Sequence, residues 1–275
     1  MSFLSRARTG SVDRSDLLAR ILVAIPAGAV AVVLILAGGP YFAVGIGLLA
    51  AACLHELYEM YAVANPSRLA GLLGLIGITC AAGFGDEQTV LMAFMATLPV
   101  IFCAVALQPG AGGAPAVSVT LLGLAWIGLA LAHAILVRGL DHGTTLVIAI
   151  ALGTFLGDTG AYLGGRAFGH TKLAASISPN KTVEGLLIGM ATCVLVVWYV
   201  ALSADGISGS QGALLGLAVA IAAPIGDLFE SFFKRDAGVK DSGRMFGPHG
   251  GALDRVDAVM FAAVAGYYTW VLLLV

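Results

Sequence analysis

The chain has 275 residues, of which 59% are hydrophobic and only 11% are charged, and its mean hydropathy is +0.97. A soluble domain carries about 25% charged residues and roughly 45–50% apolar ones, so a water-soluble globule is excluded. The formal net charge of −2 gives no indication of a nucleic-acid partner, and we expect none.

Long apolar runs follow a polar, arginine-containing segment over residues 1–20. A membrane-spanning helix needs about 20 apolar residues, and the runs neither alternate nor stay short, as barrel strands would. The sequence therefore predicts an all-α polytopic membrane protein with about nine transmembrane helices. The expected helices cover 21–37, 41–63, 69–84, 89–107, 116–137, 144–163, 183–202, 212–233 and 256–275.

We interpret residues 1–275 as a single integral-membrane domain with three parts. Residues 1–20 form a cytoplasmic segment, residues 21–140 a helical scaffold, and residues 141–275 the helices and cytoplasmic loops with the catalytic motifs. The uncharged linker 108–115 is rich in Gly and Pro and is typical of a turn.

The distribution of charge orients the predicted bundle by the positive-inside rule. With the N-terminus in the cytoplasm and helices of alternating direction, thirteen of the fourteen Lys and Arg residues fall on the inner side, and only Arg138 falls outside. The outer loops carry Asp86, Glu87, Asp141 and Asp205. The sequence thus predicts a multi-pass protein of the cell (plasma or inner) membrane whose polar loops face the cytoplasm.

Carboxylates within or beside apolar helices are the most informative feature, because charge is expensive there and by default marks a functional site. For Glu56, Glu59 and Asp257 we favour solvated helix ends or structural ion pairs. Asp227 and Asp254 are stronger candidates because of their neighbours. The full set is Glu56, Glu59, Asp158, Glu184, Asp227, Glu230, Asp254 and Asp257.

The segment 227–257 mixes basic and acidic residues with glycines. Mg²⁺ usually binds through one or two carboxylates plus substrate phosphates, and basic groups neutralise the remaining phosphate charge. Glycines allow the backbone to approach a phosphate closely. The pattern predicts a site for a polyphosphate with a divalent cation, whereas a plain positive-inside loop would need neither the glycines nor the carboxylates.

A second polar stretch over 157–185 brings Arg166, Lys172 and Lys181 to the same side of the membrane. Thr182 or Asn180 is suited to be the N-cap of the helix that follows. Two basic loops on one side indicate a shared site for an anion.

The run SFFKRDAGVKDSGRMFGPHGGALDRVD (231–257) resembles the signature of the phosphatidate cytidylyltransferase, or CDP-diacylglycerol synthase, family. GDTGAY (157–162) and SPNKTVEG (178–185) are similar to further stretches of that family, in the expected order. The close match covers 157–257, and the N-terminal half resembles the family only in being polytopic and apolar. Ala252 departs from the larger aliphatic residue that is usual in the family.

The resemblance implies that CTP and phosphatidic acid react to CDP-diacylglycerol and pyrophosphate in phospholipid biosynthesis. It also implies Mg²⁺ as the cofactor, with room for a second cation, and an all-helical, often homodimeric fold with a polar cavity that faces the cytoplasm. By motif position it assigns the metal to Asp227 and Asp254 and a catalytic place beside them to Lys240 and Asp241. The residues implied to bind nucleotide or lipid are Asp158, Asn180, Lys181, Ser231, Lys234, Arg235, His249, Gly250, Gly251 and Arg255.

Two other classes of function are the alternatives. A lipid kinase or another CTP-dependent lipid-modifying enzyme would share the charged loops but should lack the long match over 231–257. A secondary transporter should show repeated halves with broken helices near the midplane, whereas this chain has no such repeat and its acids gather at one leaflet.

Overall fold

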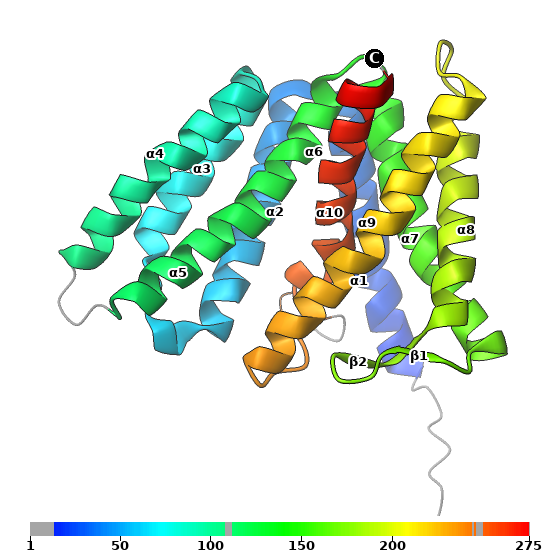
Figure 1. Ribbon diagram of the computed structural model, residues 1–275. Helices are drawn as coiled ribbons and strands as arrows, with labels where there is room; N and C mark the ends of the chain where they lie inside the picture. Colours follow the sequence, from blue (N-terminus) through cyan, green and yellow to red (C-terminus); the bar gives the residue numbers. More distant parts are fainter. Residues whose placement is uncertain (1–13, 108–111, 244, 246–249, 275) are drawn as a thin grey trace, which may run out of the picture.

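The structure is a computed structural model that describes residues 14–107, 112–243, 245 and 250–274, with the backbone alone over 14–25. It is a bundle of helices that run between two ends (Figure 1). The first half contains α1 (Arg14–Ala37), α2 (Gly39–Met60), α3 (Arg68–Phe84), α4 (Glu87–Ala106), α5 (Ala114–Gly123) and α6 (Leu129–Gly139). The second half contains α7 (Gly143–Phe168), α8 (Val183–Ala201), α9 (Gly209–Asp236) and α10 (Leu253–Thr269).

Short helical turns complete these elements. The 3-10 turn η1 (Ala62–Ala64) follows α2, the π-helical turn η2 (Leu124–Gly128) joins α5 to α6, and the π-helical turn η4 (Trp270–Leu274) continues α10. α5, η2 and α6 therefore form one continuous helical segment, and so do α10 and η4.

Each predicted apolar run coincides with a helix, so the all-α membrane architecture is confirmed. Within the described residues, seven helical segments are long and apolar enough to cross a membrane. Two shorter apolar helices cover Pro26–Ala37 and Arg68–Phe84. The expected count of nine is reached only if both of these also cross.

A β-hairpin that the sequence analysis did not predict lies between α7 and α8. β1 (Lys172–Ala174) pairs antiparallel with β2 (Ser178–Thr182), and Lys172 lies opposite Thr182. The Thr182 hydroxyl accepts a hydrogen bond from the Gly185 N–H at 3.2 Å and so caps α8. Of the two N-cap candidates, Thr182 is the correct one, and Asn180 remains free for another role.

Close helix packing beside the hairpin depends on a small residue in α8. A Cβ at Gly189 would lie 2.6 Å from the Ala161 Cβ and 2.8 Å from the Gly157 carbonyl oxygen. Lipid supplies no hydrophobic drive for helices to associate, so close contact between small residues takes over this role in membranes. Here that contact holds α7 against α8.

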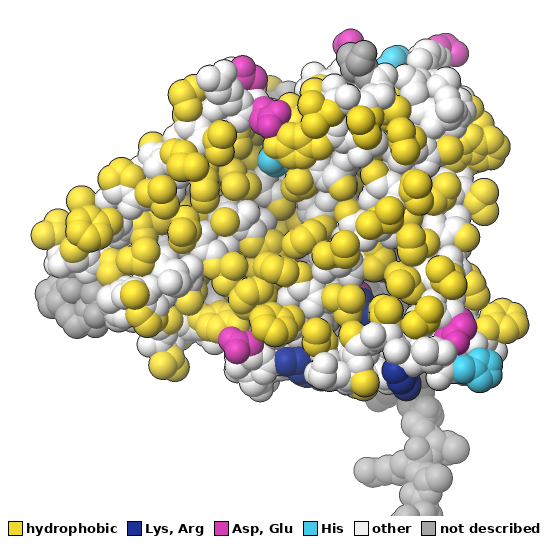
Figure 2. All heavy atoms as spheres, viewed as in Figure 1, with side chains coloured by type: hydrophobic (Ala, Val, Ile, Leu, Met, Phe, Trp, Pro, Cys, Tyr) yellow, Lys and Arg dark blue, Asp and Glu magenta, His cyan; other side chains and the backbone are white. Residues whose placement is uncertain are grey.

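The two ends of the bundle differ in charge. The hairpin and the end of α9 lie at one end, and the α8–α9 connection lies at the other (Figure 1). On the face shown in Figure 2, the visible Lys and Arg side chains gather at the hairpin end, while much of the rest is hydrophobic. At the opposite end, the Arg138 guanidinium donates to the Ile35 carbonyl at 2.7 Å and so gives a carbonyl in the last turn of α1 a hydrogen-bond partner.

This arrangement makes a prediction about membrane sidedness. Lys172 and Lys240 are exposed at the hairpin end, and Asp205 is exposed in the α8–α9 connection. Single cysteines at 172 and 240 should react with an impermeant thiol reagent from one side of sealed vesicles, and a cysteine at 205 only from the other. The unmodified chain, with its four cysteines, gives the background. Labelling of 205 and 240 from the same side would contradict this topology.

Candidate functional site

A cavity of about 540 Å³ opens between α7, α8, α9 and the hairpin. Its hairpin end is lined by polar groups, including Asp158, Lys181 and Asp227. Further toward the middle of the bundle, its lining turns apolar, with Met190 and Cys193 of α8 among the residues there. The cavity is therefore polar at one end and apolar along the helices. This distribution of polarity suits an amphiphile, which has a polar head and an apolar tail.

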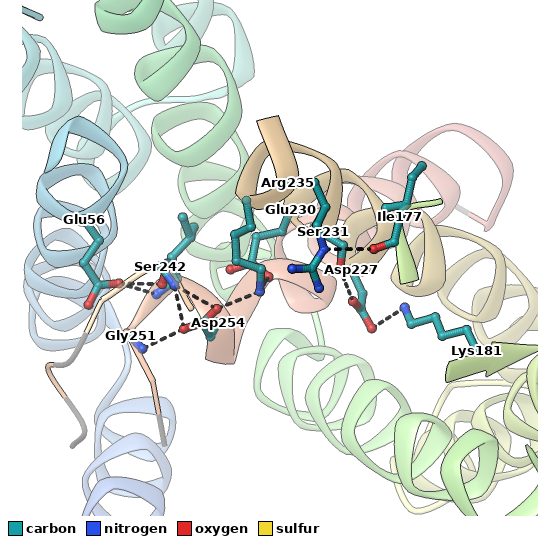
Figure 3. A network of polar contacts seen from close by, with 12 residues as sticks. Glu56, Ile177, Lys181, Asp227, Glu230, Ser231, Arg235, Ser242, Gly251 and Asp254 are labelled. Carbon is teal, nitrogen blue, oxygen red and sulfur yellow. Dashed lines mark hydrogen bonds and ion pairs between the residues drawn. The ribbon is translucent and has the colours of Figure 1, made fainter. Parts of the chain in front are cut away.

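Asp227 is the residue through which the hairpin and α9 meet at the cavity. The Lys181 ammonium, at the end of β2, forms an ion pair with the Asp227 carboxylate (Figure 3). One turn later on α9, the Ser231 hydroxyl donates to Asp227 at 3.4 Å. Asn180 and Arg166 also line this end, so four of the expected ligand-binding positions, 158, 180, 181 and 227, converge here.

A second charged cluster lies where α9 approaches the start of α10. The Lys234 Nζ donates to Glu230 Oε2 at 2.6 Å and to Asp254 Oδ1 at 2.7 Å. The side chain of Lys234 is 13% exposed, that of Asp254 9% and that of Glu230 1%. Because all three are largely removed from water, the shared ammonium group offsets the cost of burying two carboxylates.

The Asp254 carboxylate is also held by backbone donors. The Gly251 N–H donates to its Oδ2 at 2.7 Å, and the Ser242 N–H donates at 3.1 Å to Oδ2 and 3.2 Å to Oδ1. Asp254 is in the first turn of α10, where the helix dipole favours negative charge. Its orientation is therefore fixed by neighbours on both sides of the loop between α9 and α10.

The end of α9 is tied to both halves of the protein. The Tyr61 hydroxyl, just after α2, donates to Asp236 Oδ2 at 2.8 Å and to the Phe233 carbonyl at 3.1 Å. Burial, together with the Asp236 carboxylate, raises the pKa of the Tyr61 hydroxyl, which therefore stays protonated as a donor. The Arg235 Nε donates to the Ile177 carbonyl in the hairpin at 3.3 Å (Figure 3).

The remaining expected site residues are distributed around these two clusters. Lys240, Asp241 and Arg255 are exposed, and Gly250 lies just before the buried start of α10 with φ of 82°. His249 lies outside the described residues. The structure thus separates the expected set into a group at the cavity, a buried group around Lys234, and exposed charges near the loop.

Two buried carboxylates differ from the sequence interpretation. Glu56 and Asp257 are 5% and 8% exposed, so of the two expected alternatives, a solvated helix end or a structural ion pair, the solvated helix end is wrong for both. Glu59 does form the expected exposed ion pair, 2.8 Å from Arg68. Glu230 was among the informative carboxylates, but its ion pair with Lys234 was not predicted, although the i,i+4 spacing is a readable signal for one.

Asp227 and Asp254 offer the hard carboxylate oxygens that suit Mg²⁺, although they belong to two separate clusters, one at the cavity and one around Lys234. Each of them has a lysine partner, Lys181 and Lys234 respectively. Within the part of the chain that the structure describes, no group of three or more His, Cys, Asp or Glu side chains is placed to hold a metal ion. An ion here would therefore need substrate phosphate and water oxygens as its other ligands, as Mg²⁺ commonly does.

The cavity and its charged end define a polytopic membrane protein with a polar site at one end of the bundle. The sequence profile of the cytidylyltransferase family matches residues 18–273. A phosphatidate cytidylyltransferase from Synechocystis sp. is 34% identical over 292 aligned residues, covering 93% of this chain and 97% of that protein. One from Brucella suis is 35% identical over 261 residues, covering 92% and 93%. The chain belongs to the cytidylyltransferase family, and the resemblance drawn from its motifs is confirmed.

The buried cluster around Lys234 makes a prediction about stability. Lys234→Ala leaves Glu230 and Asp254 without their shared ammonium group, and removing one partner of a buried ion pair costs about 3–5 kcal/mol. We expect the variant to unfold at a clearly lower temperature than the unchanged protein in the same detergent. Lys240→Ala is the control, because Lys240 is exposed, and its unfolding midpoint should not move. Equal midpoints for Lys234→Ala and the unchanged protein would contradict a stabilising role.

Proposed function

We propose that this protein transfers the cytidylyl group of CTP to phosphatidic acid, giving CDP-diacylglycerol and pyrophosphate. The observation that carries the proposal is the full-length similarity to phosphatidate cytidylyltransferases. The cavity supports it, because a lipid phosphate fits the polar end near Lys181 and Asp227, and acyl chains fit the apolar helix surfaces beyond it.

In this reaction a phosphate oxygen of phosphatidic acid attacks the α-phosphorus of CTP. The new P–O bond forms as the bond between the α-phosphorus and the bridging oxygen to the β-phosphate breaks, and pyrophosphate leaves with that electron pair. The lipid phosphate is already a nucleophile, so no general base is required. The protein must bring two polyanions together and stabilise charge on the leaving group.

The residues of this chain divide these tasks by their position. Lys181 and Arg166 supply positive charge at the cavity, and Asn180 supplies an amide donor there. The exposed Lys240 and Arg255 add positive charge near the start of α10. We propose that Asp227 and Asp254 hold Mg²⁺, which when bound would neutralise phosphate charge and polarise the reacting phosphate.

The site would face the cytoplasm, because CTP comes from water on that side while phosphatidic acid stays in the bilayer. The concentration of Lys and Arg at the hairpin end supports this orientation under the positive-inside rule. We further propose a multi-pass location in the cell membrane and, from the family resemblance, a homodimer.

The proposed reaction is tested by the identity of its product. Purified protein with phosphatidic acid in mixed micelles, Mg²⁺ and CTP labelled in its cytidine should move the label into the lipid phase and release pyrophosphate. Chelation should stop the reaction, because uncompensated triphosphate repels the lipid phosphate, and added Mg²⁺ should restore it. If γ-phosphate label enters the lipid while cytidine label never does, the protein is a lipid kinase instead.

The proposed metal ligands have a test of their own. Asp227→Asn and Asp254→Asn should each nearly abolish turnover, because an amide replaces a hard anionic oxygen in a site with few protein ligands. Asp205→Asn is the matched control, since Asp205 is exposed at the opposite end of the bundle and should not affect turnover. Near-normal activity of both site variants, each folded in detergent, would remove the proposed metal site.

A further inference from the structure

Glu56 is a buried carboxylate that the proposed reaction does not use. It lies on α2, yet its side chain reaches the start of α10, almost two hundred residues later in the chain (Figure 3). Its Oε1 accepts from the Ala252 N–H at 3.0 Å, and its Oε2 accepts from the Leu253 N–H at 2.9 Å. The Ser242 hydroxyl also donates to Oε2, at 3.1 Å.

These contacts make Glu56 the N-terminal cap of α10. The first N–H groups of a helix have no partner within the helix, and a side-chain oxygen normally accepts from them. The N-cap residue is Ala252, whose methyl group cannot accept a hydrogen bond. A carboxylate from another helix takes that role, and the positive end of the α10 dipole offsets its buried charge.

The same contacts connect Glu56 to Asp254 through two residues. Ser242 donates its hydroxyl to Glu56 and its N–H to Asp254. Gly251 donates its N–H to Asp254, and a Cβ at Gly251 would collide with the Glu56 carboxylate. Of the two residues whose N–H groups orient Asp254, Ser242 is therefore hydrogen-bonded to Glu56. Gly251 packs beside Glu56 and precedes Ala252, whose N–H donates to that carboxylate.

The glycine at 251 has a reason here other than close approach to phosphate. A Cβ at Gly243 would likewise collide with the Glu56 carboxylate. Two glycines of the motif thus make room for a side chain of α2, which shows how closely the motif fits around this carboxylate. A group so enclosed and so fully hydrogen-bonded has one available orientation.

We propose that Glu56 is a positioning residue, which fixes the orientation of Asp254 by capping α10 and holding Ser242 and Gly251. The inference rests on the proposed function, because Asp254 is placed in that site. One expected effect does not depend on that function: loss of the Glu56 carboxylate should loosen the start of α10 whatever reaction the protein performs.

Glu56→Gln tests the proposal with little change in shape. The amide has one oxygen for the three donors and turns an N–H toward at least one of them. We expect kcat at saturating CTP and phosphatidic acid to fall about 10- to 100-fold, as misplacement of a reacting group commonly does. The KM for phosphatidic acid should not change, because the cavity between α7, α8 and α9 does not include Glu56.

Two further variants make the comparison specific. Ser242→Ala removes a single hydrogen bond to Glu56, so we expect a smaller fall in kcat than in Glu56→Gln, about 5-fold, which corresponds to about 1 kcal/mol of lost transition-state stabilisation. Glu59→Gln is the matched control, because Glu59 lies one turn further on α2, is 51% exposed and pairs with Arg68. Its kcat should equal that of the unchanged protein.

Hydrogen exchange gives a readout that does not depend on the reaction. The amides of Ala252 and Leu253 should exchange faster in Glu56→Gln than in the unchanged protein, and not in Glu59→Gln. All activities are expressed per folded protein, determined by gel filtration in detergent. Should Glu56→Gln not fold, Ser242→Ala decides by the same two measurements.

Unchanged kcat per folded protein, or unchanged exchange at the start of α10, overturns the proposal. A fall in activity that only follows the amount of folded protein also overturns it, because that result describes a structural residue. If the unchanged protein forms no CDP-diacylglycerol, the proposed function fails instead, while the exchange data still decide whether Glu56 holds the start of α10.

Discussion

Burial of charge within an apolar helix bundle is the constraint on which the charged end of this structure depends. The carboxylates at this end have hydrogen-bonding or ionic partners, and several of these partners come from other elements of the chain. Lys234 joins α9 to α10 through Asp254, Lys181 joins the hairpin to α9, and Glu56 joins α2 to α10. Lipid supplies no hydrophobic drive for helices to associate, so these polar contacts act together with close packing to specify how the elements meet at this end.

The two lysine–aspartate pairs differ in solvent exposure, and this difference suits the two pairs to different roles. Lys181 and Asp227 are 28% and 30% exposed at the cavity, whereas Lys234 and Asp254 are 13% and 9% exposed. A pair in contact with solvent contributes little to stability and exchanges partners at small cost, while breaking a buried pair is expensive. The cavity pair is therefore suited to open for a substrate phosphate, and the inner pair to hold the Asp254 carboxylate in one orientation.

The sequence predicts the helices well and the links between them poorly. Apolar runs of membrane length locate every helix, because each run must satisfy its own backbone in lipid. The hairpin at 172–182 was missed, since its two strands are short and one contains Pro179. Glu56 was misjudged for a different reason. Its partners lie 186 to 197 residues later in the chain, and the spacing of neighbouring residues in the sequence cannot indicate contacts over that separation.

The motif residues show why a signature locates a site without giving its geometry. The run 231–257 marks the correct end of the bundle, yet Asp254 and Lys234 are not among the residues that line the described cavity, while Asp158 and Asn180 from the other stretch are. Along α9, Asp227 pairs with Lys181 at the cavity, whereas Lys234, two turns later, reaches Asp254 of α10. One helix thus carries both clusters at a fixed separation. Any shift of α9 along its axis would move both clusters together. The hydrogen bonds of α9 with Tyr61 and with the hairpin therefore determine the position of both clusters relative to the lipid.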